Sequence, residues 1–134
     1  MNVTEKKVVM ASLKSFAESL GFDGFGVTSP QVGIAEKRFV DWLDAGYDGE
    51  MTYIKRGEEK RKNPDLILQG VRSILCFRKN YFTIEKDMSY VEQRDNADIS
   101  IYALNKDYHD NITSRLRQME QKIQKEVEGC RTKI

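Results

Sequence analysis

Apolar residues at helical spacing alternate with short apolar runs along this chain, and this alternation limits the fold more than any other feature. The first stripe predicts a helix that begins after a Thr4 cap and ends at Gly21. A second helix is expected over residues 34–45, before Gly46, and a third over residues 107–128. The residues expected to be buried on the first and last of these helices are Val9, Leu13, Phe16, Leu20, Ile112, Leu116, Met119 and Ile123.

The segments between these helices contain runs of strand length. Residues 22–28 (FDGFGVT) predict a strand, residues 73–77 (SILCF) a central strand covered on both faces, and residues 99–104 another strand. Residues 49–56 fit either a strand or a helical turn, and residues 58–62 predict a short helix beside a loop. The pattern therefore predicts an α/β (α+β) fold, in which helices pack on a small mixed sheet that forms a single layer.

Composition bounds the size and the surroundings of this fold. With 134 residues, 40% of them apolar, the chain can build one core, so we expect a single domain over residues 1–134. The 22 Lys and Arg nearly balance the 21 Asp and Glu, so any contact with nucleic acid must be local. No long uncharged apolar run occurs, which favours a cytoplasmic protein that does not bind membranes.

Generic catalytic and cofactor motifs are absent from the sequence. Gly21, Gly24 and Gly26 do not form a dinucleotide fingerprint, because no G-x-G-x-x-G opens a helix after a strand. Neither a P-loop nor a zinc pattern nor a G-x-S-x-G elbow occurs. The two cysteines, Cys76 and Cys130, lack metal-ligand spacing and are expected to be structural thiols. The sequence therefore predicts neither a metal site nor a standard nucleophile.

The single histidine lies in the triplet Asp107-Tyr108-His109, at an expected junction of strand and helix. Free N–H groups and the helix dipole at such a junction favour anions and a neutral imidazole, and junctions of this kind often bind ligands. The alternative is that Asp107 only caps the helix and His109 lies on its solvated first turn. A cobalt-ligating Asp-x-His motif would have glycine in place of Ile112, so axial ligation by His109 is not expected.

Basic residues gather between residues 55 and 62, just after Tyr47, Met51 and Tyr53. Aromatic rings beside cations are typical of RNA-contacting or large-ligand surfaces. The alternative is a solvated face, because Glu58 and Glu59 dilute the charge. The cations of this cluster are Lys55, Arg56, Lys60, Arg61 and Lys62.

Five segments, in their order and spacing, together resemble the opening of the epoxyqueuosine reductase family. They are residues 22–28, 39–56, 61–64, 70–74 and 102–109. The second contains a W-L-x-x-G-Y-x-G-x-M-x-Y block, and the last ends in D-Y-H. The resemblance covers nearly the whole chain.

This resemblance implies a cobalamin-dependent, iron-sulfur reductase that removes the epoxide oxygen of epoxyqueuosine in the tRNA anticodon. The positions that it assigns to cobalamin binding are Arg56, Ser100, Tyr102 and Tyr108. Asp107 and His109 are expected to line the substrate pocket. The tRNA contacts are expected from the basic cluster, at Lys60, Arg61 and Lys62.

The sequence also departs from the family pattern. Asn105 replaces a usual Gly and Ile101 a usual Arg, so the edge of the pocket is expected to differ. The family's acid, in an F-V-D segment, is expected beyond Ile134, as are the ferredoxin-like domain and the cysteine motifs for two [4Fe-4S] clusters. No catalytic residue is therefore expected within the chain.

These features predict a truncated reductase-like domain that keeps part of the corrinoid and tRNA site, binds cobalamin weakly and is inactive alone. Removing the cluster and the acid should remove turnover even where binding survives. Two alternatives stay open, a non-catalytic module that contacts tRNA and a decayed fragment. The sequence leaves open whether a separate carboxy-terminal chain supplies the missing part, and which oligomeric state the protein adopts.

Overall fold

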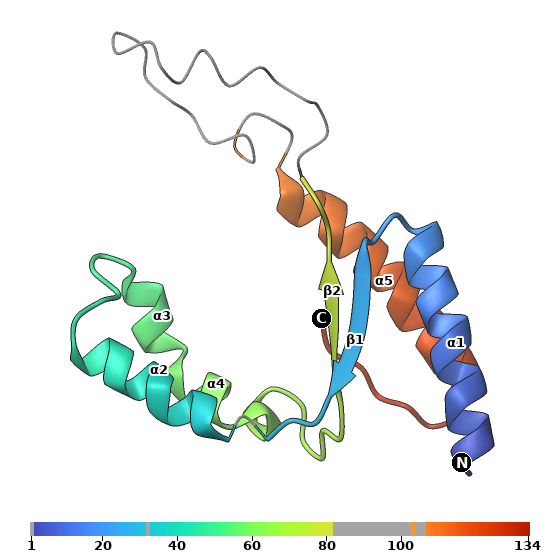
Figure 1. Cartoon of the computed structure of the whole chain (residues 1–134), viewed down its shortest axis with the longest axis horizontal. Coiled ribbons are helices and arrows are strands. Elements are labelled where there is room, and N and C mark those ends of the chain that lie inside the picture. Colours follow the sequence, from blue (N-terminus) through green and yellow to red (C-terminus); the bar gives the residue numbers. More distant parts are fainter. Residues whose placement is uncertain (1, 32, 82–102, 104–106) are drawn as a thin grey trace, which may run out of the picture. The chain divides into compact units, whose positions relative to one another are not determined.

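The computed structural model describes residues 2–31, 33–81, 103 and 107–134 (Figure 1). Within them the element order is α1 (Val3–Ser19), β1 (Gly24–Thr28), α2 (Ile34–Asp44), α3 (Thr52–Arg56), α4 (Glu58–Lys62), a 3₁₀ turn η1 (Pro64–Leu66), β2 (Ile74–Arg78) and α5 (Tyr108–Glu126). β1 and β2 pair in a two-stranded sheet and run antiparallel in Figure 1. The expected class, a small α/β sheet with helices, is confirmed.

The chain divides into two compact units. Unit 1 comprises Met1–Phe25, Phe77–Thr132 and Ile134, and unit 2 comprises Gly26–Cys76 and Lys133. Both strands of the sheet cross the boundary between the units, because the boundary falls after Phe25 in β1 and before Phe77 in β2. A single domain over residues 1–134 stays a prediction, since compact units of this kind can belong to one domain.

The cap of helix α1 is a different residue from the one predicted. Asn2 is the N-cap: its side-chain oxygen accepts from the Glu5 backbone N–H at 2.9 Å, and the Glu5 carboxylate accepts from the Asn2 backbone N–H at 2.8 Å. This reciprocal pair is a capping box. The expected Thr4 cap is therefore wrong, because Thr4 lies inside the first turn. Leu20 is the C-cap, and Gly21, which has φ of +79°, follows it and ends the helix as expected.

The core of unit 1 lies between α1 and α5, which run side by side (Figure 1). Its buried residues are Leu13, Ala17, Phe22 and Met119. Partly buried neighbours are Val9, Phe16, Leu20, Phe25, Phe77, Leu116 and Ile123. The Phe77 ring lies 4.9 Å from that of Phe22 and 5.4 Å from that of Phe25, so both strands contribute to this core. The apolar stripes expected on both helices are confirmed in part, because Leu13 and Met119 are buried, the others are only partly buried, and Ile112 lies outside this core cluster.

Strand β2 differs from the expected central strand. The predicted residues 73–77 do form most of it, but none of its residues is buried and Cys76 is exposed. The expectation of cover on both faces is wrong, because in the described part of the chain the strand has one neighbour and packs through Phe77. The further strand expected over residues 99–104 falls outside the described residues, Ala103 excepted.

Unit 2 contains the helices α2, α3 and α4. Leu43 and Asp48 are buried, and the rings of Phe39 and Trp42 stack with their centroids 6.4 Å apart. Gly46, with φ of +71°, turns the chain after α2, as the sequence indicated. The ambiguous segment 49–56 forms a helical turn, α3, rather than a strand.

Candidate functional site

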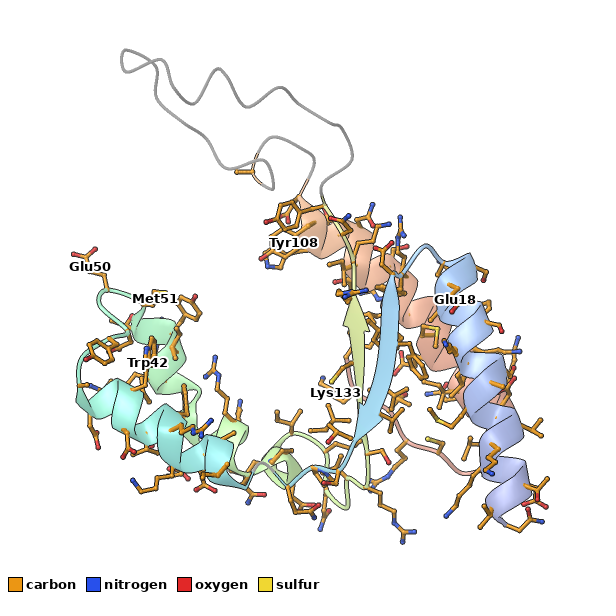
Figure 2. All side chains as sticks on the ribbon, viewed as in Figure 1. Glu18, Trp42, Glu50, Met51, Tyr108 and Lys133 are labelled. Carbon is orange, nitrogen blue, oxygen red and sulfur yellow. The ribbon has the colours of Figure 1, made fainter. Side chains whose placement is uncertain are left out.

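The triplet Asp107-Tyr108-His109 forms the start of α5, and Figure 2 marks Tyr108 there. One Asp107 carboxylate oxygen, Oδ1, accepts from the His109 backbone N–H at 2.8 Å, which confirms Asp107 as the N-cap. The same oxygen lies 2.8 Å from Nδ1 of the His109 ring. The Tyr108 and His109 rings stack with centroids 4.1 Å apart, and all three residues are exposed.

These contacts keep the Asp107 carboxylate ionised. The backbone N–H of His109, followed by its ring, lowers the pKa of Asp107, so the carboxylate stays ionised as a cap. When Nδ1 carries a proton it donates to Asp107, and Nε2 then points to the other side of the ring. The triplet thus presents a ring pair and one imidazole nitrogen to solvent. Such a surface can stack on a flat ligand and exchange one hydrogen bond.

The other predicted site residues that the structure describes lie in unit 2. Arg56 is the last residue of α3, and α4 carries the three cations expected to contact tRNA. Among the described residues, the side chains of Arg56 and Lys60 make no hydrogen bond, ion pair or ring contact, and both are exposed. Arg61 and Lys62, by contrast, are bound to neighbours. The three cations of α4 are therefore not equivalent.

The predicted residues thus fall into two described groups, one in each unit. Asp107, Tyr108 and His109 lie together in unit 1, and Arg56 lies with the α4 cations in unit 2. Ser100 and Tyr102, expected to bind cobalamin, lie outside the described residues, as do the departures at residues 101 and 105.

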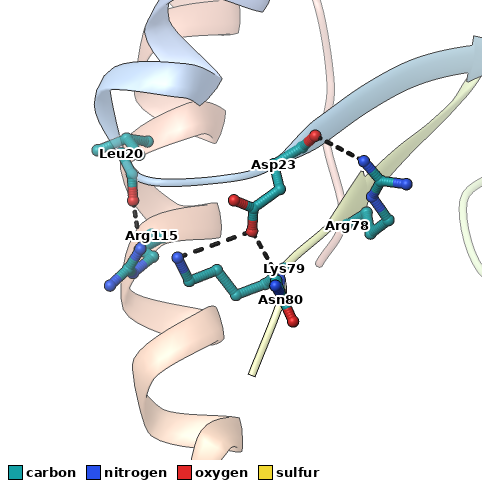
Figure 3. Close-up of polar contacts among 6 residues, drawn as sticks. All are labelled: Leu20, Asp23, Arg78, Lys79, Asn80 and Arg115. Atoms are coloured by element: carbon teal, nitrogen blue, oxygen red, sulfur yellow. Dashed lines mark hydrogen bonds and ion pairs between the residues drawn. The ribbon is translucent and has the colours of Figure 1, made fainter. Parts of the chain in front are cut away.

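Figure 3 shows a polar cluster of unit 1 that the sequence reading missed, formed by Leu20, Asp23, Arg78, Lys79, Asn80 and Arg115. Asp23 Oδ2 accepts from the Asn80 backbone N–H at 2.6 Å and lies 3.8 Å from Lys79 Nζ. The Asn80 N–H is the largest cause that lowers the pKa of Asp23. Arg78 donates to the Asp23 carbonyl at 3.0 Å, and Arg115 donates to the Leu20 carbonyl at the end of α1. The cluster ties α1, the strands and α5 together.

A sequence signal for this cluster exists, although it is weak. Asp23 follows the end of a helix, and three polar residues follow the apolar run of β2. Gly21 is needed beside them, because a Cβ there would lie 2.7 Å from Arg115 Nη1 and the residue has positive φ. These contacts join residues up to 95 positions apart, so local pattern alone does not reveal them.

Unit 2 contains an open depression of about 340 Å³. It lies where the chain before α2 meets the α4–η1 connection, and its lining includes Pro30, Glu36, Lys62, Asn63 and Asp65. Asp65 Oδ1 already accepts from the Gly70 N–H at 2.7 Å, and the Asn63 side chain accepts from the Asp65 N–H at 3.2 Å. Its polar lining is therefore largely used to hold the η1 turn.

The described part of the chain contains no group of three or more His, Cys, Asp or Glu residues that could hold a metal ion. Cys76 and Cys130 are free thiols there. Within the same residues, no helix combines the length and apolarity needed to cross a membrane.

We predict that the purified chain carries no stoichiometric iron-sulfur cluster. A [4Fe-4S] cluster takes four cysteine thiolates, and the whole sequence contains two cysteines. Iron and acid-labile sulfide should therefore both be far below one cluster per chain after anaerobic purification. Stoichiometric iron and sulfide in the purified wild-type chain would contradict this expectation. Iron that also persists after Cys76→Ser would show that ligands other than this thiol hold it.

Comparison with known proteins identifies the family. Residues 61–134 match the family described as "Epoxyqueuosine reductase QueG, DUF1730". The matched part includes β2 and the whole of α5 with its Asp107-Tyr108-His109 start. The chain belongs to this family.

Individual relatives agree with the family match. The chain is 35% identical over 117 residues to the epoxyqueuosine reductase of Pseudomonas aeruginosa, a match that covers 87% of this chain and 32% of the relative. It is 34% identical to that of Vibrio cholerae, with 86% and 31% covered, and 34% identical to that of Gloeobacter violaceus, with 90% and 37% covered. The chain thus spans about a third of the length of these curated relatives. No solved structure matches it.

Proposed function

We propose that this chain forms part of the corrinoid and tRNA surface of a cytoplasmic epoxyqueuosine reductase, and that it binds without completing the reduction alone. The observation that carries the proposal is the exposed Tyr108–His109 ring pair at the capped start of α5, within the part of the chain that matches the family. A reduction also requires an electron donor and an acid that protonates the departing oxygen. We propose that other parts of the reductase supply both.

The exposed ring pair of unit 1 suits one wall of a cobalamin site. A corrin presents a broad apolar face ringed by amides, and sites for such ligands combine aromatic side chains with a few polar groups. The Tyr108 ring is half exposed and stacked on His109, which suits a flat face. Arg56 of unit 2 is proposed by itself as a second contact, because its guanidinium has no described partner and can donate to an amide or phosphate oxygen. When bound, cobalamin would supply the redox-active metal.

His109 is assigned to the substrate side of this surface. The contact of Nδ1 with Asp107 sets the orientation of its ring. Carboxylates commonly orient functional imidazoles in this way. Nε2 is then available for one hydrogen bond to a nucleobase or to the oxygen that leaves. Asp107 acts as a positioning residue, because its carboxylate is occupied by the His109 backbone and ring.

Calorimetry with cobalamin tests this proposal. We expect micromolar or poorer affinity, a binding free energy of at most about 8 kcal/mol, because one wall covers only part of the ligand. Arg56→Ala and Tyr108→Ala should each weaken binding further. Arg38→Ala is the matched control, since Arg38 is also exposed and without a described partner in unit 2. Nanomolar binding that is unchanged in Arg56→Ala and Tyr108→Ala would contradict the assignment.

A second candidate function is a tRNA-contacting module without catalysis. The exposed cations of α3 and α4 favour it, together with the exposed rings of Tyr47 and Tyr53, since nucleic acids are bound by cations that track the backbone and rings on which bases stack. Binding of tRNA without any binding of cobalamin would select this candidate over the first. A chain that binds neither would be a decayed fragment.

A further inference from the structure

Helices α3 and α4 meet at one glycine. Gly57 is both the C-cap of α3 and the N-cap of α4: its N–H donates to the Ile54 carbonyl at 3.2 Å and its carbonyl accepts from the Arg61 N–H at 3.1 Å. The direction in which Lys55 and Arg56 leave α3 relative to Lys60 on α4 therefore depends on this corner.

The Arg61 side chain folds back over the corner. Its Nη1 donates to the Ile54 carbonyl at 2.8 Å, and its guanidinium carbon lies 5.9 Å from the centre of the Phe39 ring in α2. A cation suits the carbonyl end of a helix and the face of an aromatic ring. Arg61 thus connects α2, α3 and α4 at once.

The fit around Arg61 depends on the absence of a side chain at Gly57. A Cβ at this position would overlap Arg61 Nη1 and would lie 3.0 Å from its guanidinium carbon. The backbone of Gly57, with φ of −96°, would accept alanine. Gly57→Ala therefore displaces the guanidinium while every charge of the protein is kept.

Lys62 is also held within the unit. Its Nζ lies 3.4 Å from a Glu58 oxygen and 3.6 Å from a Glu59 oxygen, and these carboxylates, Glu59 first, raise the pKa of Lys62. Lys55 and Lys60 differ from it, because their exposed side chains have no partner among the residues described.

We propose that Arg61 is a positioning residue that holds the α3–α4 corner, and that Lys55 and Lys60, rather than Arg61 and Lys62, contact the phosphates of an RNA backbone. A cation without a partner among the described residues gives up no described contact when it meets a phosphate, whereas Arg61 would give up the Ile54 carbonyl. This inference rests on the RNA contact proposed above and changes which residues make it.

The salt dependence of RNA binding separates the two roles. With a labelled tRNA transcript and the full chain, log affinity should fall with log salt at a slope of about 1.4 to 1.8 for two phosphate contacts. Lys55→Ala and Lys60→Ala should each reduce that slope by about 0.7 to 0.9. Arg61→Ala and Gly57→Ala should keep the slope and lower the affinity by one constant factor at every salt concentration.

Unfolding of the same variants provides an independent readout. Arg61→Ala and Gly57→Ala should lower the denaturant midpoint, while Lys60→Ala, which places the same alanine on the same short helix, should leave it unchanged. A slope that drops in Arg61→Ala as much as in Lys60→Ala would overturn the positioning role. So would equal midpoints for all variants. If the wild type binds no RNA at low salt, the proposed RNA contact fails, and the midpoints still decide the role of Arg61.

Discussion

Replacing Met119 by alanine should lower the free energy of unfolding by about 2 to 5 kcal/mol, the range for removal of a large buried side chain. Met119 on α5 is 1% exposed and packs with Leu13, Ala17 and Phe22. Its removal leaves a cavity between α1 and α5 that the surrounding helices fill only in part. Urea unfolding followed by circular dichroism measures this loss.

Met10→Ala is the matched control for this prediction. Met10 lies on α1 and is 37% exposed, so the same chemical change there should cost less than about 1 kcal/mol. Similar losses in the two variants would mean that the α1–α5 contact is not the core of the protein in solution.

Replacing Glu126 by glutamine should have the second largest effect, a loss of about 1 to 3 kcal/mol at neutral pH. Glu126 Oε1 accepts from Ser12 Oγ at 2.5 Å and from Lys122 Nζ at 2.8 Å, so it links α1 to α5. Its other oxygen is buried and has no hydrogen-bond partner among the described residues. Glutamine keeps the shape of the side chain but loses the charge that pairs with Lys122.

The pH dependence of this loss has a definite sign. Lys122, followed by Ser12, lowers the pKa of Glu126 below its ordinary value of 4.5. A carboxylate with a lowered pKa in the folded state stabilises it above the unfolded pKa, and this contribution disappears as the pH falls through the folded value. The difference between wild type and Glu126→Gln should therefore be full at neutral pH and shrink steadily below about pH 4.5.

Glu128→Gln serves as the control, because Glu128 is an exposed carboxylate just after α5 with no described partner. Its stability should follow that of the wild type at every pH. A Glu126→Gln difference that stays constant from neutral to acidic pH would contradict the prediction, because it would show that the charge of Glu126 does not cause the loss.

The local order of the fold could be read from the sequence because it depends on near neighbours. The stripes of α1 and α5 follow from 3.6-residue spacing, and β1 follows from its aromatic and β-branched residues. The predicted cap at Thr4 lies two residues too late, although Asn2-x-x-Glu5 satisfies the capping pattern. The burial of β2 was overestimated because an apolar run does not say how many neighbours a strand has.

The candidate site could be predicted from the sequence only in part, because some of its contacts are local and others are not. The Asp107 cap could be predicted, since capping is local. The different states of Lys60 and Arg61 could not, because they depend on whether a side chain reaches a carbonyl seven residues back and a ring in another helix. Adjacent cations look alike in sequence, yet they differ in the contacts that they make with other described residues.

Unit 2 interrupts unit 1 in the sequence, and this affects the order in which the protein can assemble during translation. Residues 26–76 emerge as one continuous stretch, whereas the partners of Leu13 on α5 emerge about a hundred residues later. At typical rates of synthesis that delay is roughly 5 to 20 seconds. During this delay the apolar face of α1 lacks the partners that α5 provides in the folded chain, and it stays uncovered or makes temporary contacts instead.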